Sequence, residues 1–214
     1  MAIKPEGWGF KYPFCYQKCP SPVFSAYLIV WLFTLFFHFF YTNLRGIVLP
    51  FLLLIIPLSI RGDIHLRFRF KDLLAGIFVS ITVLVPLGFS IIAFANSLTF
   101  YKTFRQLFLS PPVGWDIIIY QLFGVAFPEE VFFRGFIQES LGRSISSIVY
   151  TSLLFSLCHL PSVIAGSSPV VLLTFFPSLI MGALYYWTSN ILPSVVFHFL
   201  SNIFFISLIQ LMPE

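Results

Sequence analysis

The chain has 214 residues, of which 58% are hydrophobic and only 9% are charged. Soluble domains carry about a quarter charged residues, so this composition excludes an ordinary soluble domain and indicates that lipid surrounds most of the surface. The formal net charge is +4, but the Lys and Arg residues lie between apolar runs, as they do in the loops of membrane proteins, and we expect no nucleic-acid partner.

Seven apolar runs approach the roughly 20 residues that a membrane-spanning helix needs. The second run is short and is also compatible with a re-entrant hairpin, while Pro86 and Gly88 are expected to kink the third. The sequence therefore predicts an all-α polytopic bundle with a polar cavity within the membrane. The predicted spans are 23–41, 44–60, 73–95, 115–141, 145–164, 169–187 and 193–212.

These spans are interpreted as one membrane domain, 1–214, with a tail at 1–22, spans without a motif within 23–114 and catalytic spans within 115–212. Cytoplasmic loops of membrane proteins carry an excess of Lys and Arg. The tail and the loops after the second and fourth spans hold most of these residues, so we expect a multi-pass protein of the cell membrane with a cytoplasmic N-terminus. The Lys and Arg residues that this orientation places on the opposite side of the membrane are Arg45, Lys102 and Arg105.

The fourth predicted span carries charged residues in its middle, where each one costs roughly 2.5–3.5 kcal/mol on insertion scales. Glu130 and Arg134 are four residues apart, so they share a helical face and are predicted to form a structural ion pair. Glu129 lies about 100° around the helix from Glu130 and lacks such a partner. Pro128 just before it opens the helix locally, so Glu129 is the candidate for a polar cavity.

Two further spans carry polar stripes that contain a histidine. In the fifth, His159 follows Ser152 and Ser156 at helical spacing, and Pro161 is expected to bend or end the helix. In the seventh, His198 and Asn202 lie one turn apart on one face. A lone His on an apolar helix is more often a core residue whose hydrogen bonds are made within the protein than a catalyst. Two such histidines on separate spans, together with an unpaired carboxylate on a third, favour a common site.

A carboxylate with a neighbouring His activates water, and a second His with an Asn donates to a developing oxyanion. Glu129, His159, His198 and Asn202 would thus support hydrolysis of an amide. Glu129 and the two His residues are also a ligand set for zinc, although the H-E-x-x-H pattern is absent, so zinc is left open as a cofactor. A serine nucleophile is disfavoured, because no G-x-S-x-G pattern occurs.

The same residues resemble the motifs of a known family of intramembrane peptidases. Glu129-Glu130-x-x-x-Arg134 is similar to the E-E-x-x-x-R motif of the CAAX-protease-and-bacteriocin-processing family. Phe155-x-x-x-His159 resembles its second motif. The third and fourth motifs resemble the stretch that contains Gly182, Tyr185, Asn190, Pro193, His198 and Asn202.

This resemblance implies a glutamic-type peptidase without a cofactor that acts on a membrane-anchored or lipidated protein. It implies Glu129 as the general base, His159 as the residue that positions the water, and His198 and Asn202 as oxyanion donors. Glu130 and Arg134 would be structural. The alternatives are a non-catalytic scaffold or immunity protein of the same fold and a proton-coupled transporter. The charge distribution favours access from the side where the fourth span ends, and the oligomeric state is not predicted.

Overall fold

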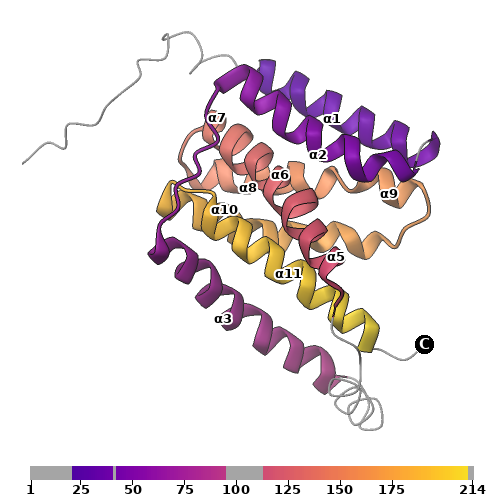
Figure 1. Ribbon diagram of the computed structural model, residues 1–214, viewed down its shortest axis with the longest axis vertical. Coiled ribbons are helices and arrows are strands. Elements are labelled where there is room, and N and C mark those ends of the chain that lie inside the picture. Colours follow the sequence, from indigo (N-terminus) through magenta and orange to yellow (C-terminus); the bar gives the residue numbers. More distant parts are fainter. Residues whose placement is uncertain (1–20, 41, 95–112, 212–214) are drawn as a thin grey trace, which may run out of the picture.

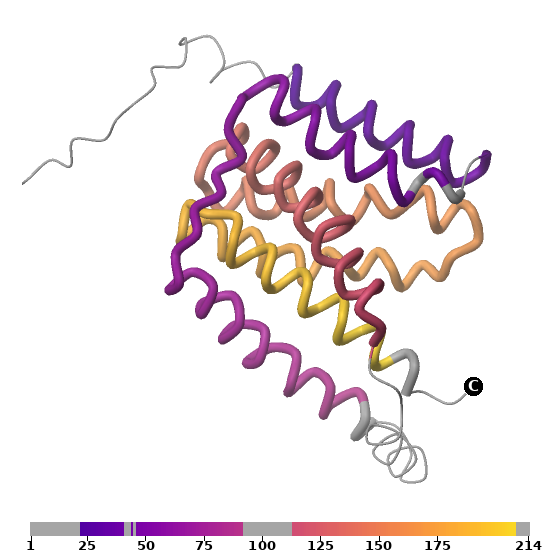
Figure 2. Tube along the Cα trace, in the orientation of Figure 1, coloured from indigo at the N-terminus to yellow at the C-terminus, as the bar shows by residue number. Residues whose placement is uncertain are grey.

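The computed structural model describes residues 21–40, 42–94 and 113–211. Within these residues the chain forms helices and connecting loops and no strand, which confirms the predicted all-α fold. Figures 1 and 2 show a bundle in which α1 and α2 lie side by side at the top, α3 lies at the bottom, and the remaining helices fill the space between them.

The first three helices match the first three predicted spans. They are α1 (Ser21–Phe40), α2 (Thr42–Arg61) and α3 (Phe70–Phe94). The second span is one continuous helix of 20 residues that includes two prolines, so it does not form the alternative re-entrant hairpin. The third span likewise continues through Pro86.

The fourth predicted span is a continuous helical rod whose hydrogen-bond pattern changes along its length. It consists of α5 (Trp115–Ile119), the π-helix η1 (Tyr120–Ala126), α6 (Phe127–Glu130), the π-helix η2 (Val131–Gln138) and α7 (Glu139–Leu141). The last three predicted spans follow as helices. They are α8 (Ile145–Leu157) with α9 (Leu160–Ile164), the 3₁₀-helix η3 (Pro169–Thr174) with α10 (Phe175–Thr188), and α11 (Leu192–Leu211).

Four helical segments are long and apolar enough to cross a membrane by length and composition, and they lie at 22–40, 70–91, 145–164 and 169–188. Two shorter apolar helices lie at 46–61 and 192–208. Apolar side chains along these helices face outward, among them Phe24, Phe51 and Phe78. A surface of this kind suits lipid rather than water, so the molecule is a helical membrane bundle.

The fourth span lies inside the bundle, where it contacts α2, α8, α10 and α11. Its second half supplies much of the core, because Phe132, Phe133, Phe136 and Ile137 pack with residues of α8, α10 and α11. In contrast, α3 packs along α11 at the edge of the bundle. A β-carbon on Gly76 of α3 would lie 2.8 Å from the backbone oxygen of Pro193, so the two helices approach closely there.

The linker between α2 and α3 is tied to the short turn between α10 and α11. The buried Asn190 side chain accepts a hydrogen bond from the backbone N–H of Arg67 (3.0 Å) and donates to the carbonyl of the same residue (2.6 Å). It also donates to the carboxylate of Asp72 (2.7 Å). These bonds fix the start of α11, and therefore the height at which His198 and Asn202 stand in the bundle.

Candidate active site

The backbone around Glu129 departs from regular α-helix on both sides. The π-helix η1 precedes α6 and the π-helix η2 follows it, so Glu129 and Glu130 lie on a single α-helical turn between two wider segments. Pro128 lies within this turn and has no N–H to donate. Short π-helical segments are frequent at functional sites, and here they occur where the sequence predicted a local opening of the helix.

The predicted pair of Glu130 and Arg134 is confirmed, and it is fully buried. The Nε atom of Arg134 lies 3.2 Å from Oε2 of Glu130, and both side chains have an exposed fraction of 0%. Arg134 also donates through Nη2 to the carbonyl (2.9 Å) and the hydroxyl (2.8 Å) of Ser178 on α10. Its guanidinium carbon lies 5.1 Å from the ring centroid of Phe155 on α8. The pair thus joins the fourth span to two neighbouring helices.

His198 stands between the two adjacent carboxylates. Its Nδ1 atom lies 2.9 Å from Oε1 of Glu130, and its Nε2 atom lies 3.7 Å from Oε2 of Glu129. A hydrogen bond to the Glu130 carboxylate requires the proton on Nδ1. In the neutral ring Nε2 then carries the lone pair, and in the doubly protonated ring it is a second donor that faces Glu129.

His159 occupies the turn between α8 and α9, so the helix ends before Pro161 as expected. Its Nδ1 atom lies 2.9 Å from the carbonyl oxygen of Phe155. The two rings also contact each other, with centroids 5.1 Å apart, and the ring of Phe155 makes an edge contact with His198 at 5.6 Å. Phe155 therefore touches both histidines and sets the orientation of the His159 ring, whose Nε2 atom carries the lone pair when Nδ1 donates.

A cavity of about 220 Å³ brings Glu129 and His159 together with the first two helices. The Glu129 side chain keeps an exposed fraction of 18%, whereas that of Glu130 is 0%. The cavity is lined by Val30, Thr34, His38, Gly46, Leu49, Pro50, Leu53, Tyr120, Gly124, Val125, Glu129, Phe133, Cys158, His159 and Ser162. Its lining on the fourth span runs from Phe133 back to Tyr120, toward the start of the span, and the side of access stays a prediction.

Asn202 lies one helical turn beyond His198 on α11. Its side-chain amide donates to Oε1 of Gln121 on η1 at 3.0 Å. The structure therefore joins Glu129 to His159 through the cavity and to His198 through a direct contact, whereas neither His198 nor Asn202 is among the residues that line the cavity. The catalytic roles of these four residues stay predictions.

Three polar residues of this region were not predicted from the sequence. Thr34 and His38 on α1 line the cavity, and Gln121 binds Asn202. Thr34 and His38 could have been identified from their spacing of four residues on an apolar helix. Spacing of this kind identified the polar faces of the fifth and seventh spans. Gln121 belongs to no such pattern, because Asn202, to which it is bonded, lies on a helix distant in sequence.

Among the residues that the structure describes, no group of three or more His, Cys, Asp and Glu side chains is arranged to hold a metal ion. The predicted zinc ligands Glu129, His159 and His198 do not form such a group in this arrangement, and zinc as a cofactor stays an open alternative. One nitrogen of His198 is bonded to Glu130 instead. The chemistry below is accordingly derived from the protein groups alone.

Comparison with known proteins gives one match. The family model described as "Type II CAAX prenyl endopeptidase Rce1-like" matches residues 111–204, a little under half of the chain. This segment contains the Glu130–Arg134 pair and all four predicted catalytic residues, and the match confirms the family resemblance drawn from the sequence. Neither the curated proteins nor the solved structures that were compared contain a match.

Proposed function

We propose that this membrane protein is a glutamic-type intramembrane endopeptidase, because residues 111–204 match the family model of type II CAAX prenyl endopeptidases. It hydrolyses a peptide bond near the membrane end of a membrane-anchored or lipidated substrate. The observation that carries the proposal is Glu129, which is the only carboxylate among the described residues that line the cavity, and which shares that cavity with His159.

Glu129 is the general base in this proposal. Its carboxylate accepts a proton from a water molecule in the cavity, while the oxygen of that water attacks the carbonyl carbon of the scissile bond. Glu129 then passes the proton to the leaving amine. A positioned base contributes about 10²–10⁴-fold to such a reaction. His159 holds the water through its ring nitrogen, because the carbonyl of Phe155 fixes the other nitrogen.

His198 and Asn202 stabilise the negative charge that develops on the carbonyl oxygen. Glu130 holds one nitrogen of His198, so in the doubly protonated ring the other nitrogen is a second donor. The Asn202 amide carries two N–H donors, one of which is bonded to Gln121, and the second is available for the substrate. Donors that are fixed before the reaction stabilise the transition state without a reorganisation cost.

The test is cleavage of quenched, membrane-anchored peptides by the purified protein in lipid vesicles. Wild type, Glu129→Gln and the control Glu139→Gln, which changes another carboxylate of the same span, are compared with and without a strong chelator. The proposal expects cleavage that survives the chelator, persists in the control and disappears in Glu129→Gln. Cleavage that is lost to the chelator and restored by zinc would contradict the metal-free mechanism.

The same variant separates the peptidase from a scaffold of the same fold. If no peptide is cleaved and the cellular phenotype of a deletion is rescued by Glu129→Gln as well as by wild type, the protein acts without catalysis. Rescue by wild type but not by Glu129→Gln would instead show that the function of the protein depends on this carboxylate.

A further inference from the structure

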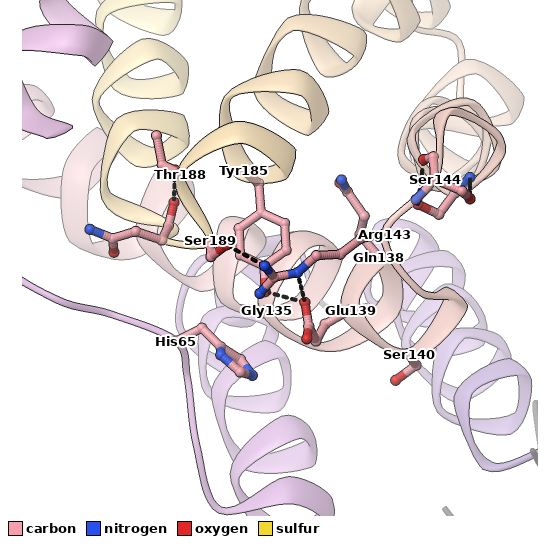
Figure 3. Close-up of polar contacts among 12 residues, drawn as sticks. His65, Gly135, Gln138, Glu139, Ser140, Arg143, Ser144, Tyr185, Thr188 and Ser189 are labelled. Carbon is pink, nitrogen blue, oxygen red and sulfur yellow. Dashed lines mark hydrogen bonds and ion pairs between the residues drawn. The ribbon is translucent and has the colours of Figure 1, made fainter. Parts of the chain in front are cut away.

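The two ends of α8, the helix that leads to His159, are held by different parts of the chain. At its start, the backbone N–H of Ser147 donates to the hydroxyl of Ser144 at 3.1 Å, and the backbone N–H of Ser144 donates to the hydroxyl of Ser147 at 3.2 Å. Figure 3 shows this start, beside which Arg143 forms an ion pair with Glu139. The start of α8 is therefore fixed by residues that lie close to it in the sequence.

The end of α8 is held by α1 instead. Carbonyl groups at the end of an α-helix lack N–H partners within the helix. This end lies inside an apolar segment that is long enough to span a membrane, where no water supplies the missing donors. The hydroxyl of Tyr27 on α1 donates to the carbonyl of Leu154 at 3.0 Å. The indole Nε1 of Trp31, one turn further along α1, donates to that of Leu157, also at 3.0 Å.

The two carbonyls between these points bind His159 itself. The carbonyl oxygen of Phe155 lies 2.9 Å from Nδ1 of the His159 ring. The carbonyl of Ser156 accepts a hydrogen bond from the backbone N–H of His159 at 3.0 Å. The turn that α1 holds is therefore the turn that fixes both the ring and the backbone of His159, and a shift of this turn carries the histidine with it.

A single face of α1 carries both donors and a part of the cavity wall. Thr34 and His38, which line the cavity, follow Trp31 by three and seven residues and so lie on the same side of the helix. The helix also contacts α9, which follows His159. Through one face, α1 thus bounds the cavity and determines where His159 stands in it.

From these contacts we propose that Tyr27 and Trp31 are positioning residues, which hold His159 where its ring binds the water in the cavity. This inference rests on the proposed peptidase function, in which that water is activated by Glu129. Both donors lie outside residues 111–204, the segment that matches the family model. The first helix therefore completes a site whose reacting groups all come from the C-terminal half of the chain.

The kinetic test removes one donor at a time and keeps the aromatic ring. Tyr27→Phe and Trp31→Phe are compared with Tyr150→Phe and Trp187→Phe, which remove the same donors from exposed side chains of α8 and α10. We expect kcat per folded molecule to fall about 2–10-fold in each test variant, as the loss of one hydrogen bond implies. The KM stays close to that of wild type, because neither donor is among the residues that line the cavity. Both controls keep the wild-type values.

The position of the His159 ring is measured without any activity. The histidine rings of the purified protein are isotope-labelled and their signals are recorded by NMR in detergent micelles, where the signal that is lost in His159→Gln belongs to His159. We expect Tyr27→Phe and Trp31→Phe each to shift or broaden this signal. The signal of His65, which lies in the linker between α2 and α3, stays unchanged and shows that the fold is intact.

An unchanged His159 signal in both test variants would overturn the inference. A shifted signal with wild-type kcat in both variants would overturn it as well, because the position of the ring would then not affect the reaction. If the wild-type protein cleaves no peptide, the proposed function fails, whereas a shifted His159 signal still shows that α1 holds this histidine. The two failures are therefore distinguishable.

Discussion

The two halves of the fourth span illustrate how one helix serves two purposes. Its first half contains half-exposed residues such as Tyr120 and Gln121 and borders the cavity. Its second half, η2, is buried throughout and joins α8 and α10 by the contacts of Arg134. The two halves meet at α6, where the adjacent Glu129 and Glu130 fall on either side of the division.

Glu129 and Glu130 have the same chemistry and differ in their surroundings. The roughly 100° between successive helical residues turns one toward the cavity and the other toward Arg134 and His198. The comparison teaches that one of two adjacent carboxylates in a membrane span can be held in a buried ion pair while the other faces a cavity. The predictions below test whether the division between the two halves is as sharp as the structure indicates.

The largest effect on stability is expected from Glu130→Gln. This change leaves the buried charge of Arg134 without its carboxylate, and breaking a buried pair costs about 3–5 kcal/mol. Thermal unfolding of the purified protein in detergent measures the loss. Glu129→Gln is the matched control, because its side chain is partly exposed. Equal stability of Glu130→Gln and wild type would show that the ion pair does not hold the helices together.

Gly182→Leu is expected to have the next largest effect. A β-carbon at this position of α10 would lie 2.8 Å from the Ile148 side chain and 3.2 Å from that of Gln138. Overpacking of this kind costs about 1–3 kcal/mol, and it would push α10 away from Arg134, with a loss of peptidase activity. Ala183→Leu, at the neighbouring half-exposed position, should keep both the unfolding temperature and the turnover. Unchanged turnover in Gly182→Leu would contradict the expectation.

Gln121→Leu tests the first half of the span. Loss of the hydrogen bond to Asn202 frees this amide from its fixed position, and one hydrogen bond contributes about 0.5–1.5 kcal/mol. We expect kcat to fall by up to about tenfold, because 1.4 kcal/mol corresponds to a factor of ten, while the unfolding temperature stays close to that of wild type. If Asn202→Ala lowers kcat and Gln121→Leu has no effect, Gln121 does not position the amide.

The smallest effect is expected from His38→Leu. His38 lines the cavity from α1, so it contributes to the polar wall that a substrate contacts rather than to the reacting atoms. We expect a higher KM with kcat nearly unchanged, which steady-state kinetics on one quenched peptide would reveal. A large fall in kcat at constant KM would instead assign His38 to the chemical step.

The sequence predicted the parts of this structure that depend on local periodicity. The apolar runs define the helices, and the spacing of four residues identifies the pair of Glu130 and Arg134. The end of α8 before Pro161 follows from the missing backbone donor of proline.

The parts that depend on contacts between distant helices could not be predicted in the same way. The bond between His198 and Glu130 joins residues 68 positions apart, and the π-helical form of η1 and η2 leaves no mark in the spacing of polar residues. The position of the cavity along the span could not be predicted, because Lys and Arg counts report the orientation of the chain and not the packing that buries one half of the span.

The most direct test of the division between Glu129 and Glu130 is to measure turnover per folded molecule and unfolding temperature for Glu129→Gln and Glu130→Gln in parallel. The account predicts that Glu129→Gln loses turnover by about 10²–10⁴-fold at an unfolding temperature close to that of wild type, whereas Glu130→Gln mainly loses stability. Wild-type turnover in Glu129→Gln, or an equal loss of stability in both variants, would contradict it.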